Sequence, residues 1–401
     1  MKRQILMITP YLPCRSQSGG QTRSFFQIKH LSQKNDITLI CFTRDQKGLD
    51  ELKHYCHKVI IIKRGKTWDL KKIFFTGFSP YPFLVTNYLS LELQEKIKEE
   101  LNNHHFDLIH TECFYLMPNI PKTDIPIILV DQTIEFAVYQ HHVESLIGLK
   151  KCLAPLLWID VMKIKYWENY YWKKTDHIAA VSAEDKQIMS RLSKRIDIKI
   201  VPNGVDDLFF QTVKTTKKTS YPSILFGISN MKWMQNSEGA QLLLKDIWPK
   251  VKKALPTAKL FIIGRFAPST FANITDPDII IKEAENDGHS DDPQSYYQRS
   301  WLLVAPIKSG GGSRTKFFEA MASKLPILTT KQGIEGIDIV NNQHAIIGDY
   351  QQLATIAIKL LKNPKHLVSI GDNAQQLVKD QYSWAKSAHT LNDIYAQITK
   401  K

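Results

Sequence analysis

The sequence is poor in cysteine and in long apolar runs, and both absences limit what the protein can be. Its 401 residues include 5 cysteines, and no two of them stand in a C-x-x-C spacing. This argues against a disulfide framework or a zinc site and favours a reducing cytoplasm. No apolar stretch has the roughly 18 residues of a transmembrane helix. The short run Ile5–Ile8 ends at Thr9-Pro10, which predicts a buried first strand rather than a signal peptide.

Acidic residues are also scarce relative to basic ones. The 39 Asp and Glu against 53 Lys and Arg give a net charge of +14. Such a balance suits phosphorylated substrates, an anionic membrane surface or nucleic acid, or it reflects a solvated basic surface without a specific partner. Because the basic residues are dispersed and no recognition motif occurs, we do not expect nucleic acid as a partner.

Short apolar runs alternate with amphipathic stretches along the whole chain. Uniformly apolar strands are typical of a parallel sheet that helices cover on both faces. In the first half the expected strands are Gln4–Thr9, Ile37–Phe42, Val59–Ile62, Leu108–His110 and Ile127–Val130. In the second half they are Ile224–Ile228, Leu260–Gly264, Ile279–Ile281, Leu302–Pro306, Pro326–Thr329 and Ala345–Ile347. We therefore predict an α/β fold with two doubly wound halves in tandem.

A long aromatic and basic segment, Leu146–Trp172, has Leu157, Val161 and Ile164 at helical spacing. We favour a helix packed on the domain core. The alternative is a helix that lies on an anionic membrane surface, where basic and aromatic residues on one helix are common.

The run Ser309–Glu319 (SGGGSRTKFFE) has the pattern of a phosphate site. The strand Leu302–Pro306 precedes it, and strong helix formers follow from Thr315 onward. Strand, glycine loop and helix together present backbone N–H groups and a positive helix end to an anion. The glycines, which lack side chains, let a phosphate approach the backbone closely. They are Gly310, Gly311 and Gly312.

Two cations, Arg314 and Lys316, stand at the start of the same expected helix. Cations at a helix N-terminus are unfavourable by roughly 0.3–1 kcal/mol unless an anion binds there. Arg314 can donate hydrogen bonds to two phosphate oxygens at once, while Lys316 acts as a point charge. Glu319, one turn further on, is placed to accept hydrogen bonds from sugar hydroxyls. The alternative is a plain loop with exposed cations.

The same run resembles the C-terminal signature of family-4 glycosyltransferases, in the branch with a G-G-G-x-R-x-K loop before E-A-M-A and G-x-E-G. Further segments agree in order, namely VSAEDKQIM, VPNGVD, GISNMKWMQN, AKLFIIGR and QYSWAK. The resemblance implies a GT-B fold, in which two Rossmann-like domains with parallel sheets face a central cleft. It implies an acceptor domain over 1–205, a donor domain over 206–375, and a C-terminal helix over 376–401 that packs back toward the N-terminal domain.

The resemblance also assigns donor-site residues in the second half. Lys232 matches a cation on the diphosphate. The arginine that the family usually has nearby is absent, and Ser229 and Asn230 stand there instead. Arg314 and Lys316 are assigned to the leaving-group charge. Glu319 matches the second glutamate of a paired motif and is assigned to the ribose. The first glutamate would fall at Gly311 and is missing. The remaining assigned donor residues are Gly310, Gly312 and Ser313.

In the first half, the resemblance places Gly19 and Gly20 in a glycine loop near the donor phosphates. Glu112 stands where the family often has an active-site histidine, and His110 lies one side-chain period earlier. Either is a candidate to orient the acceptor or assist proton transfer, with a buried structural histidine as the alternative for His110. Glu135 and Asn203 are further candidates to line the cleft.

The implied function is transfer of a sugar from a nucleotide-diphosphate sugar to a glycan, glycolipid or protein acceptor, with retention of configuration and without a metal or other cofactor. We expect a role in cell-surface polysaccharide or glycoconjugate synthesis, in the cytoplasm, with an anionic membrane surface as a candidate partner. Two alternatives are a nucleotide-sugar epimerase of the same fold and a non-catalytic GT-B binding protein. Production of an epimer without acceptor, or binding without turnover, would distinguish them.

Overall fold

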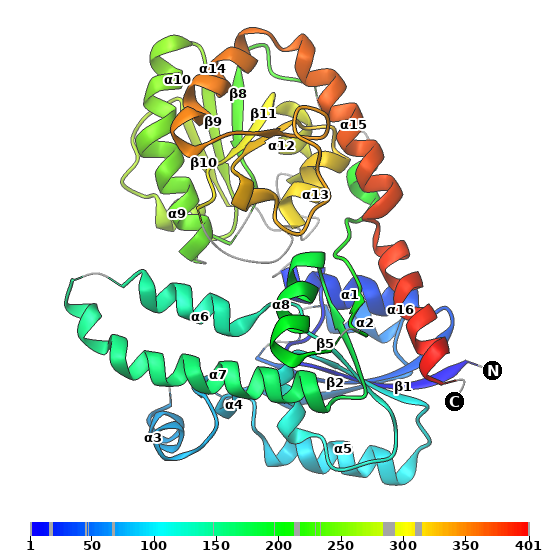
Figure 1. The fold of residues 1–401 in the computed structure, drawn as a ribbon. Helices are drawn as coiled ribbons and strands as arrows, with labels where there is room; N and C mark the ends of the chain where they lie inside the picture. Colours follow the sequence, from blue (N-terminus) through cyan, green and yellow to red (C-terminus); the bar gives the residue numbers. More distant parts are fainter. Residues whose placement is uncertain are drawn as a thin grey trace. The chain divides into compact units, whose positions relative to one another are not determined.

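Two parallel β-sheets, one in each half of the chain, form the framework of the protein (Figure 1). The computed structural model describes residues 2–15, 19–44, 46, 48–65, 69–146, 148–195, 197–211, 217–228, 230–232, 234–283, 293–308 and 315–399. The chain divides into an N-terminal unit, Met1–Cys14, Gly20–Pro202 and Ser387–Lys401, and a C-terminal unit, Arg15–Gly19 and Asn203–Lys386.

The N-terminal unit has a seven-stranded sheet of order β3-β2-β1-β4-β5-β6-β7, in which every pair is parallel. Its strands are β1 (Arg3–Thr9), β2 (Asn35–Thr43), β3 (Lys58–Lys63), β4 (Leu108–Glu112), β5 (Ile127–Val130), β6 (His177–Ala180) and β7 (Lys199–Ile200). The first five match the expected strands. The sequence pattern missed β6, which is short and half alanine, and β7, which has two residues.

Helices alternate with these strands. They are α1 (Gly19–Leu31), α2 (Leu49–Lys53), α3 (Leu70–Phe78), α4 (Phe83–Thr86), α5 (Leu91–Asn103), η1 (Phe114–Asn119), α6 (Glu135–Glu144), η2 (Gly148–Leu153), α7 (Ala154–Lys174) and α8 (Ala183–Ser193). The last helix, α16 (Trp384–Ile398), belongs to this unit from Ser387 onward.

The C-terminal unit has a six-stranded parallel sheet of order β10-β9-β8-β11-β12-β13. Its strands are β8 (Ser223–Phe226), β9 (Lys259–Ile263), β10 (Ile279–Lys282), β11 (Leu302–Ala305), β12 (Ile327–Thr329) and β13 (Ile346–Ile347). Its helices are η3 (Asp207–Phe210), α9 (Met234–Leu242), η4 (Leu243–Ile247), α10 (Trp248–Ala254), α11 (Ala267–Thr270), α12 (Pro293–Arg299), α13 (Thr315–Ala322), η5 (Lys331–Ile334), η6 (Tyr350–Gln352), α14 (Leu353–Lys362) and α15 (Lys365–Gln381).

Alternate residues of the C-terminal strands enter two separate apolar clusters. Leu225 and Leu303 pack in one cluster, whereas their neighbours Ile224 and Leu302 pack in the other. Successive side chains of a strand point to opposite faces, so both faces of this sheet are buried. The α/β class predicted from the sequence is therefore confirmed, with a Rossmann-like parallel sheet in each unit.

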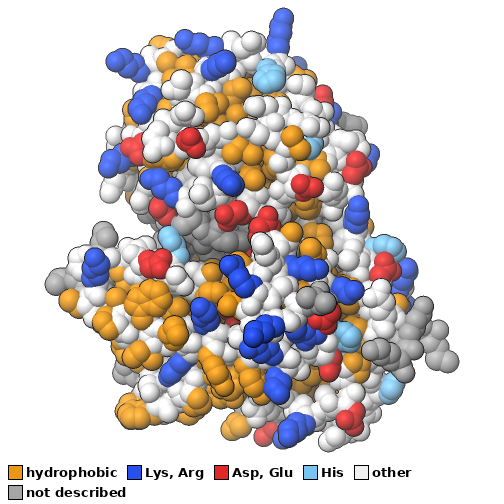
Figure 2. Space-filling model, viewed as in Figure 1, with side chains coloured by type: hydrophobic (Ala, Val, Ile, Leu, Met, Phe, Trp, Pro, Cys, Tyr) orange, Lys and Arg blue, Asp and Glu red, His pale blue; other side chains and the backbone are white. Residues whose placement is uncertain are grey.

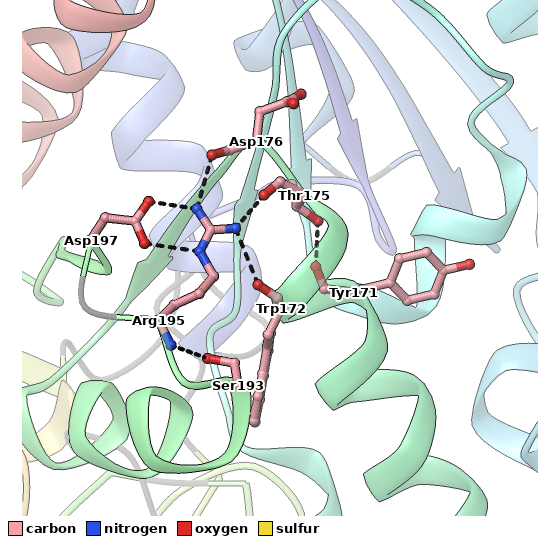
Figure 3. A network of polar contacts seen from close by, with 7 residues as sticks. All are labelled: Tyr171, Trp172, Thr175, Asp176, Ser193, Arg195 and Asp197. Atoms are coloured by element: carbon pink, nitrogen blue, oxygen red, sulfur yellow. Dashed lines mark hydrogen bonds and ion pairs between the residues drawn. The ribbon is translucent and has the colours of Figure 1, made fainter.

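Within the segment Leu146–Trp172, α7 packs Val161, Ile164 and Trp172 into the protein, as predicted for a helix on the domain core. Its C-terminal end is closed by Arg195 (Figure 3). The guanidinium donates to the carbonyls of Trp172 (3.2 Å), Thr175 and Asp176 (3.0 Å), and it pairs with Asp197. The last carbonyls of a helix lack hydrogen-bond partners within the helix. Arg195 donates to the carbonyl of Trp172 and so holds this residue in place.

Candidate functional site

The strand order of each sheet reverses once, between β1 and β4 and between β8 and β11. In open α/β sheets, ligands bind outside the carboxyl ends of the strands at such a reversal. Glu112 is the last residue of β4, Lys232 follows β8, and Lys316 stands in the helix after β11. The topology therefore brings predicted residues to the expected edge in each unit.

Lys316 is buried in the first turn of α13. Its Nζ donates to Asn236 Oδ1 (3.2 Å) and lies 4.9 Å from the ring centroid of Phe226, the last residue of β8. The ammonium group is thus held at the carboxyl end of β8. Because the ammonium group is already fixed, the binding of an anion costs little further conformational entropy of this side chain.

Asn236, in α9, is a residue that the sequence analysis missed. Its side-chain oxygen accepts from Lys316, while its Nδ2 donates to the backbone oxygen of Asn230 (3.0 Å). Asn236 therefore connects the predicted Lys316 to the predicted Asn230. The segment GISNMKWMQN ends at Asn236, but its sequence assigned this residue no role, because the connection depends on how α9 lies beside the loop after β8.

Glu319 is one turn beyond Lys316 and accepts a hydrogen bond from the Tyr297 hydroxyl in α12 (2.8 Å). Burial raises the pKa of Glu319 to about 7, although the Tyr297 hydrogen bond acts in the opposite direction. Asp206 raises the pKa further and Lys316 lowers it. Glu319 is thus a carboxyl group that changes charge near neutral pH. Tyr297, like Asn236, is a contact residue of the site that no sequence pattern indicated.

Lys232 is exposed, and its Nζ lies 3.8 Å from the ring centroid of Phe266. Phe266 has a φ of 63°, a left-handed conformation that is uncommon for a bulky residue. Its N–H donates to both carboxylate oxygens of Glu283 (2.9 and 3.1 Å), which stabilises that conformation. Phe266 therefore positions the cation that the sequence predicted, although its backbone conformation could not be foreseen.

The other predicted donor residues are Gly310, Gly311, Gly312, Ser313 and Arg314, and they lie outside the described residues. Asn203 is half-buried in the loop before β8. The next residue, Gly204, packs on backbone: a Cβ there would lie 2.7 Å from the carbonyl carbon of Ser383.

In the N-terminal unit, His110 and Glu112 are adjacent and fully buried. His110 Nε2 lies 3.4 Å from Glu112 Oε1, and His110 Nδ1 hydrogen-bonds the hydroxyl of Tyr395 in α16. The structure thus brings the two predicted residues together. It also adds Tyr395, a residue 285 positions along the chain from His110 that sequence reasoning missed.

Three side chains of α1 complete the surroundings of Glu112. Ser24 Oγ donates to Glu112 Oε2 (3.2 Å), and the Gln27 amide donates to Glu112 Oε1 (3.2 Å) while accepting from Arg23 (3.0 Å). Arg23 is buried and also donates to the carbonyl of Val201 (2.8 Å). The carboxylate is therefore held by a polar network, which we call the Arg23–Glu112 network.

Gly19 and Gly20, the predicted glycine pair, open α1 and differ sharply in their surroundings. A Cβ at Gly20 would overlap the Tyr11 hydroxyl and lie 2.6 Å from Gln132 Oε1, two groups that hydrogen-bond each other at 2.8 Å. A Cβ at Gly19 would have no described atom within 4 Å. Gly20 is thus required for the close approach of Tyr11 and Gln132, whereas Gly19 is not.

Gly20→Ala should lower the free energy of unfolding by about 1–3 kcal/mol, because the methyl group overpacks the site. Gly19→Ala is the matched control and should be neutral or slightly stabilising, since alanine is the better helix former. Denaturant unfolding measures both. Equal effects of the two substitutions would contradict this account.

Glu135 begins α6 and is half-buried, next to a group of buried carboxylates. Burial and the nearby Asp131 raise the pKa of Glu135 to about 8. Glu168 of α7 accepts from the N–H groups of Glu135 (2.8 Å) and Phe136 (3.1 Å), so it caps α6. Asp131 accepts from the indole of Trp172 (2.5 Å), and burial raises its pKa. Glu168 thus positions the predicted Glu135, and Asp131 acts on it only through its charge.

Among the residues that the structure describes, no group of three or more His, Cys, Asp or Glu side chains is placed to hold a metal ion. In the same part of the chain, no helix combines the length and apolar character needed to cross a membrane.

Two family models match the chain. Residues 18–207 match "Glycosyltransferase Family 4", and residues 222–363 match "Glycosyl transferases group 1". The first match contains strands β2–β7, the second contains β8–β13, and together they support a GT-B glycosyltransferase. A search of curated protein sequences found no significant match.

Solved structures with the same fold cover nearly the whole chain. A glycosyltransferase from Rickettsia africae is 17% identical with a TM-score of 0.67, covering 100% of this chain and 99% of its own. Sucrose-phosphate synthase from Thermosynechococcus elongatus is 14% identical with a TM-score of 0.71, covering 99% of both chains. HepE from Anabaena, solved with UDP and glucose, is 11% identical with a TM-score of 0.64, covering 98% of this chain and 100% of its own. At these sequence identities, the similarity to the solved structures shows a shared fold alone.

Proposed function

We propose that the protein is a retaining glycosyltransferase that moves a sugar from a nucleoside-diphosphate sugar to a hydroxyl acceptor, in cell-surface polysaccharide or glycoconjugate synthesis. The observation that carries this proposal is the pair Lys316 and Glu319, a fixed cation and an acid one turn apart at the carboxyl edge between β8 and β11. The complex of HepE with UDP and glucose supports a nucleoside-diphosphate sugar as the donor class.

In this mechanism the diphosphate leaves with its electron pair, and negative charge develops on its oxygens. Lys316, Lys232 and Arg314 stabilise that charge, so the proposal requires no metal. Glu319 binds the ribose hydroxyls. The acceptor hydroxyl attacks the anomeric carbon on the face that the diphosphate leaves and transfers its proton to the departing phosphate. No nucleophilic carboxylate is needed, in contrast to most retaining glycosidases.

The N-terminal residues take supporting roles in this proposal. Because His110 and Glu112 are fully buried, we assign them to positioning the carboxyl edge of β4 rather than to direct contact with the acceptor. Glu135, which is half-buried, is the candidate to contact an acceptor hydroxyl.

The test is turnover of a panel of nucleoside-diphosphate sugars by the full chain, with release of the nucleoside diphosphate measured and product anomers assigned by NMR. Acceptor-dependent release with retained configuration is expected. An inverted product would contradict retention. Conversion of the sugar nucleotide to its epimer without acceptor would instead identify an epimerase. Binding without any turnover would identify a non-catalytic binding protein.

Donor affinity should rise as the pH increases from 6 to 8, by up to about tenfold. The free Glu319 has a pKa of about 7, and hydroxyl groups that donate to the carboxylate favour its charged form. Binding therefore lowers this pKa and releases a proton, so higher pH favours the complex.

Calorimetric titration of the donor at several pH values measures this dependence. Glu319→Gln is the control because it cannot titrate, and its pH slope should be smaller than that of the wild type. An identical slope in both proteins would exclude Glu319 as the group that contacts the ribose.

A further inference from the structure

Helix α7 is apolar on two faces, and one of them is exposed. Leu156, Ile159, Met162 and Tyr166 are all more than half exposed, and their spacing of three and four residues places them on one face. Val161 and Ile164, on another face, are buried in the N-terminal unit. A surface helix normally exposes polar residues opposite its buried stripe, so packing within this unit does not explain the exposed stripe.

Helix α3 extends the same surface. Phe74 and Phe78 are exposed, Phe78 at 82%, and their ring centroids are 4.8 Å apart. Lys163 of α7 donates to the carbonyls of Thr76 (2.8 Å) and Ser79 (2.7 Å), which holds the C-terminal end of α3 against α7. The two helices are therefore neighbours, and we call their exposed apolar side chains together the α3–α7 face. Figure 2 shows hydrophobic side chains gathered over these helices, with cationic side chains among them.

The exposed charges of α7 are positive. Both acids of this helix are engaged: Asp160 accepts from the N–H of Phe83 (2.8 Å), and Glu168 is buried. Lys151 precedes α7, Lys173 and Lys174 end it, and all three are exposed. The apolar stripe is therefore flanked at both ends by lysines, whose long stems can lie along an apolar phase while the ammonium groups stay in water.

We propose that the α3–α7 face docks on an anionic lipid bilayer and lies in its interface without crossing it. Large apolar side chains flanked by lysines match the hydrocarbon boundary and the anionic headgroups together. A second copy of the chain would match less well, because symmetric pairing of this face would bring lysine-bearing rims of the same charge together.

The test is sedimentation of the full chain with phosphatidylcholine vesicles, with and without phosphatidylglycerol. Wild-type protein should bind the anionic vesicles and release at high salt, because salt screens the lysines. Phe74→Ser/Phe78→Ser should reduce the partition coefficient at least about tenfold. Lys173→Gln/Lys174→Gln should reduce it about fivefold for each lysine. Val368→Ser is the control, since Val368 is an apolar side chain, 66% exposed, in the C-terminal unit.

Cys152 supplies a second measurement, because it is exposed and lies just before α7. An environment-sensitive fluorophore on Cys152 should shift to shorter wavelength with anionic vesicles and remain unchanged with neutral ones. Unaltered melting temperatures would show that the variants are folded.

Three results would overturn the proposal. The first is no binding of wild-type protein to anionic vesicles, and the second is binding that the two Phe substitutions leave unchanged. The third comes from analytical ultracentrifugation: a dimer that these substitutions convert to a monomer, without vesicle binding, would assign the face to a second copy of the chain. None of these outcomes depends on the proposed transferase activity.

Discussion

Replacing Lys316 with methionine should weaken nucleoside-diphosphate binding roughly 10–100-fold, the loss expected when a charge-assisted hydrogen bond to an anion is removed. Methionine keeps most of the side chain's length beside Phe226 and removes the charge and the contact with Asn236. The binding defect should therefore exceed any loss of stability. Isothermal titration calorimetry with a nucleoside diphosphate measures the change directly.

The control for this experiment is Lys324→Met. Lys324 lies just beyond α13 and forms an exposed ion pair with Asp372, a kind of contact that contributes little to stability. Its removal should leave binding unchanged. If Lys316→Met and Lys324→Met bind the diphosphate equally well, Lys316 is not part of the anion site, and the donor assignment of α13 is wrong.

Arg23→Met should lower the free energy of unfolding by about 3–5 kcal/mol, the loss typical when one partner of a buried charged pair is removed. Arg23 is buried and linked to Glu112 through Gln27, so the substitution leaves a buried carboxylate without its compensating charge. Denaturant unfolding measures the loss. Lys53→Met, which removes an exposed cation paired with Asp50, should change stability by less than about 0.5 kcal/mol.

A double-mutant cycle separates the charge effect from lost packing. Glu112→Gln removes the uncompensated charge, so it should recover part of the stability that Arg23→Met loses. If the two losses simply add, the Arg23–Glu112 network carries no electrostatic coupling. His110 and Glu112 would then lose their proposed role in holding the edge of β4.

The local pattern of the sequence was sufficient for the elements of the fold. All six strands expected in the second half are present, because each is a short apolar run, and β8, β9, β11 and β12 bury most or all of their residues. The apolar pattern did not identify β6 and β7, because HIAA and the two-residue strand Lys199–Ile200 contain few large apolar residues. Their place in the sheet depends on pairing with β5 and with each other.

The candidate site was predictable where it follows a strand end. Lys316 was identified from the spacing of glycines, cations and an acid after an apolar run, and Lys232 and Glu112 were identified from the family resemblance at strand ends. Their partners were not identifiable in this way. Asn236, Tyr297 and Tyr395 come from helices whose position beside the strands no local pattern specifies.

The sequence by itself therefore determined the two parallel α/β halves, because apolar periodicity is a local property. The phosphate-loop character of Ser309–Glu319 stays a prediction from the local spacing of glycines, cations and an acid. The tertiary structure alone decided which residues hold Lys316, Glu112 and Glu135 in place. It also showed that α7 leaves an apolar face exposed. Contacts and burial depend on segments far apart in the chain, so they are decided only when the sheets are assembled and covered.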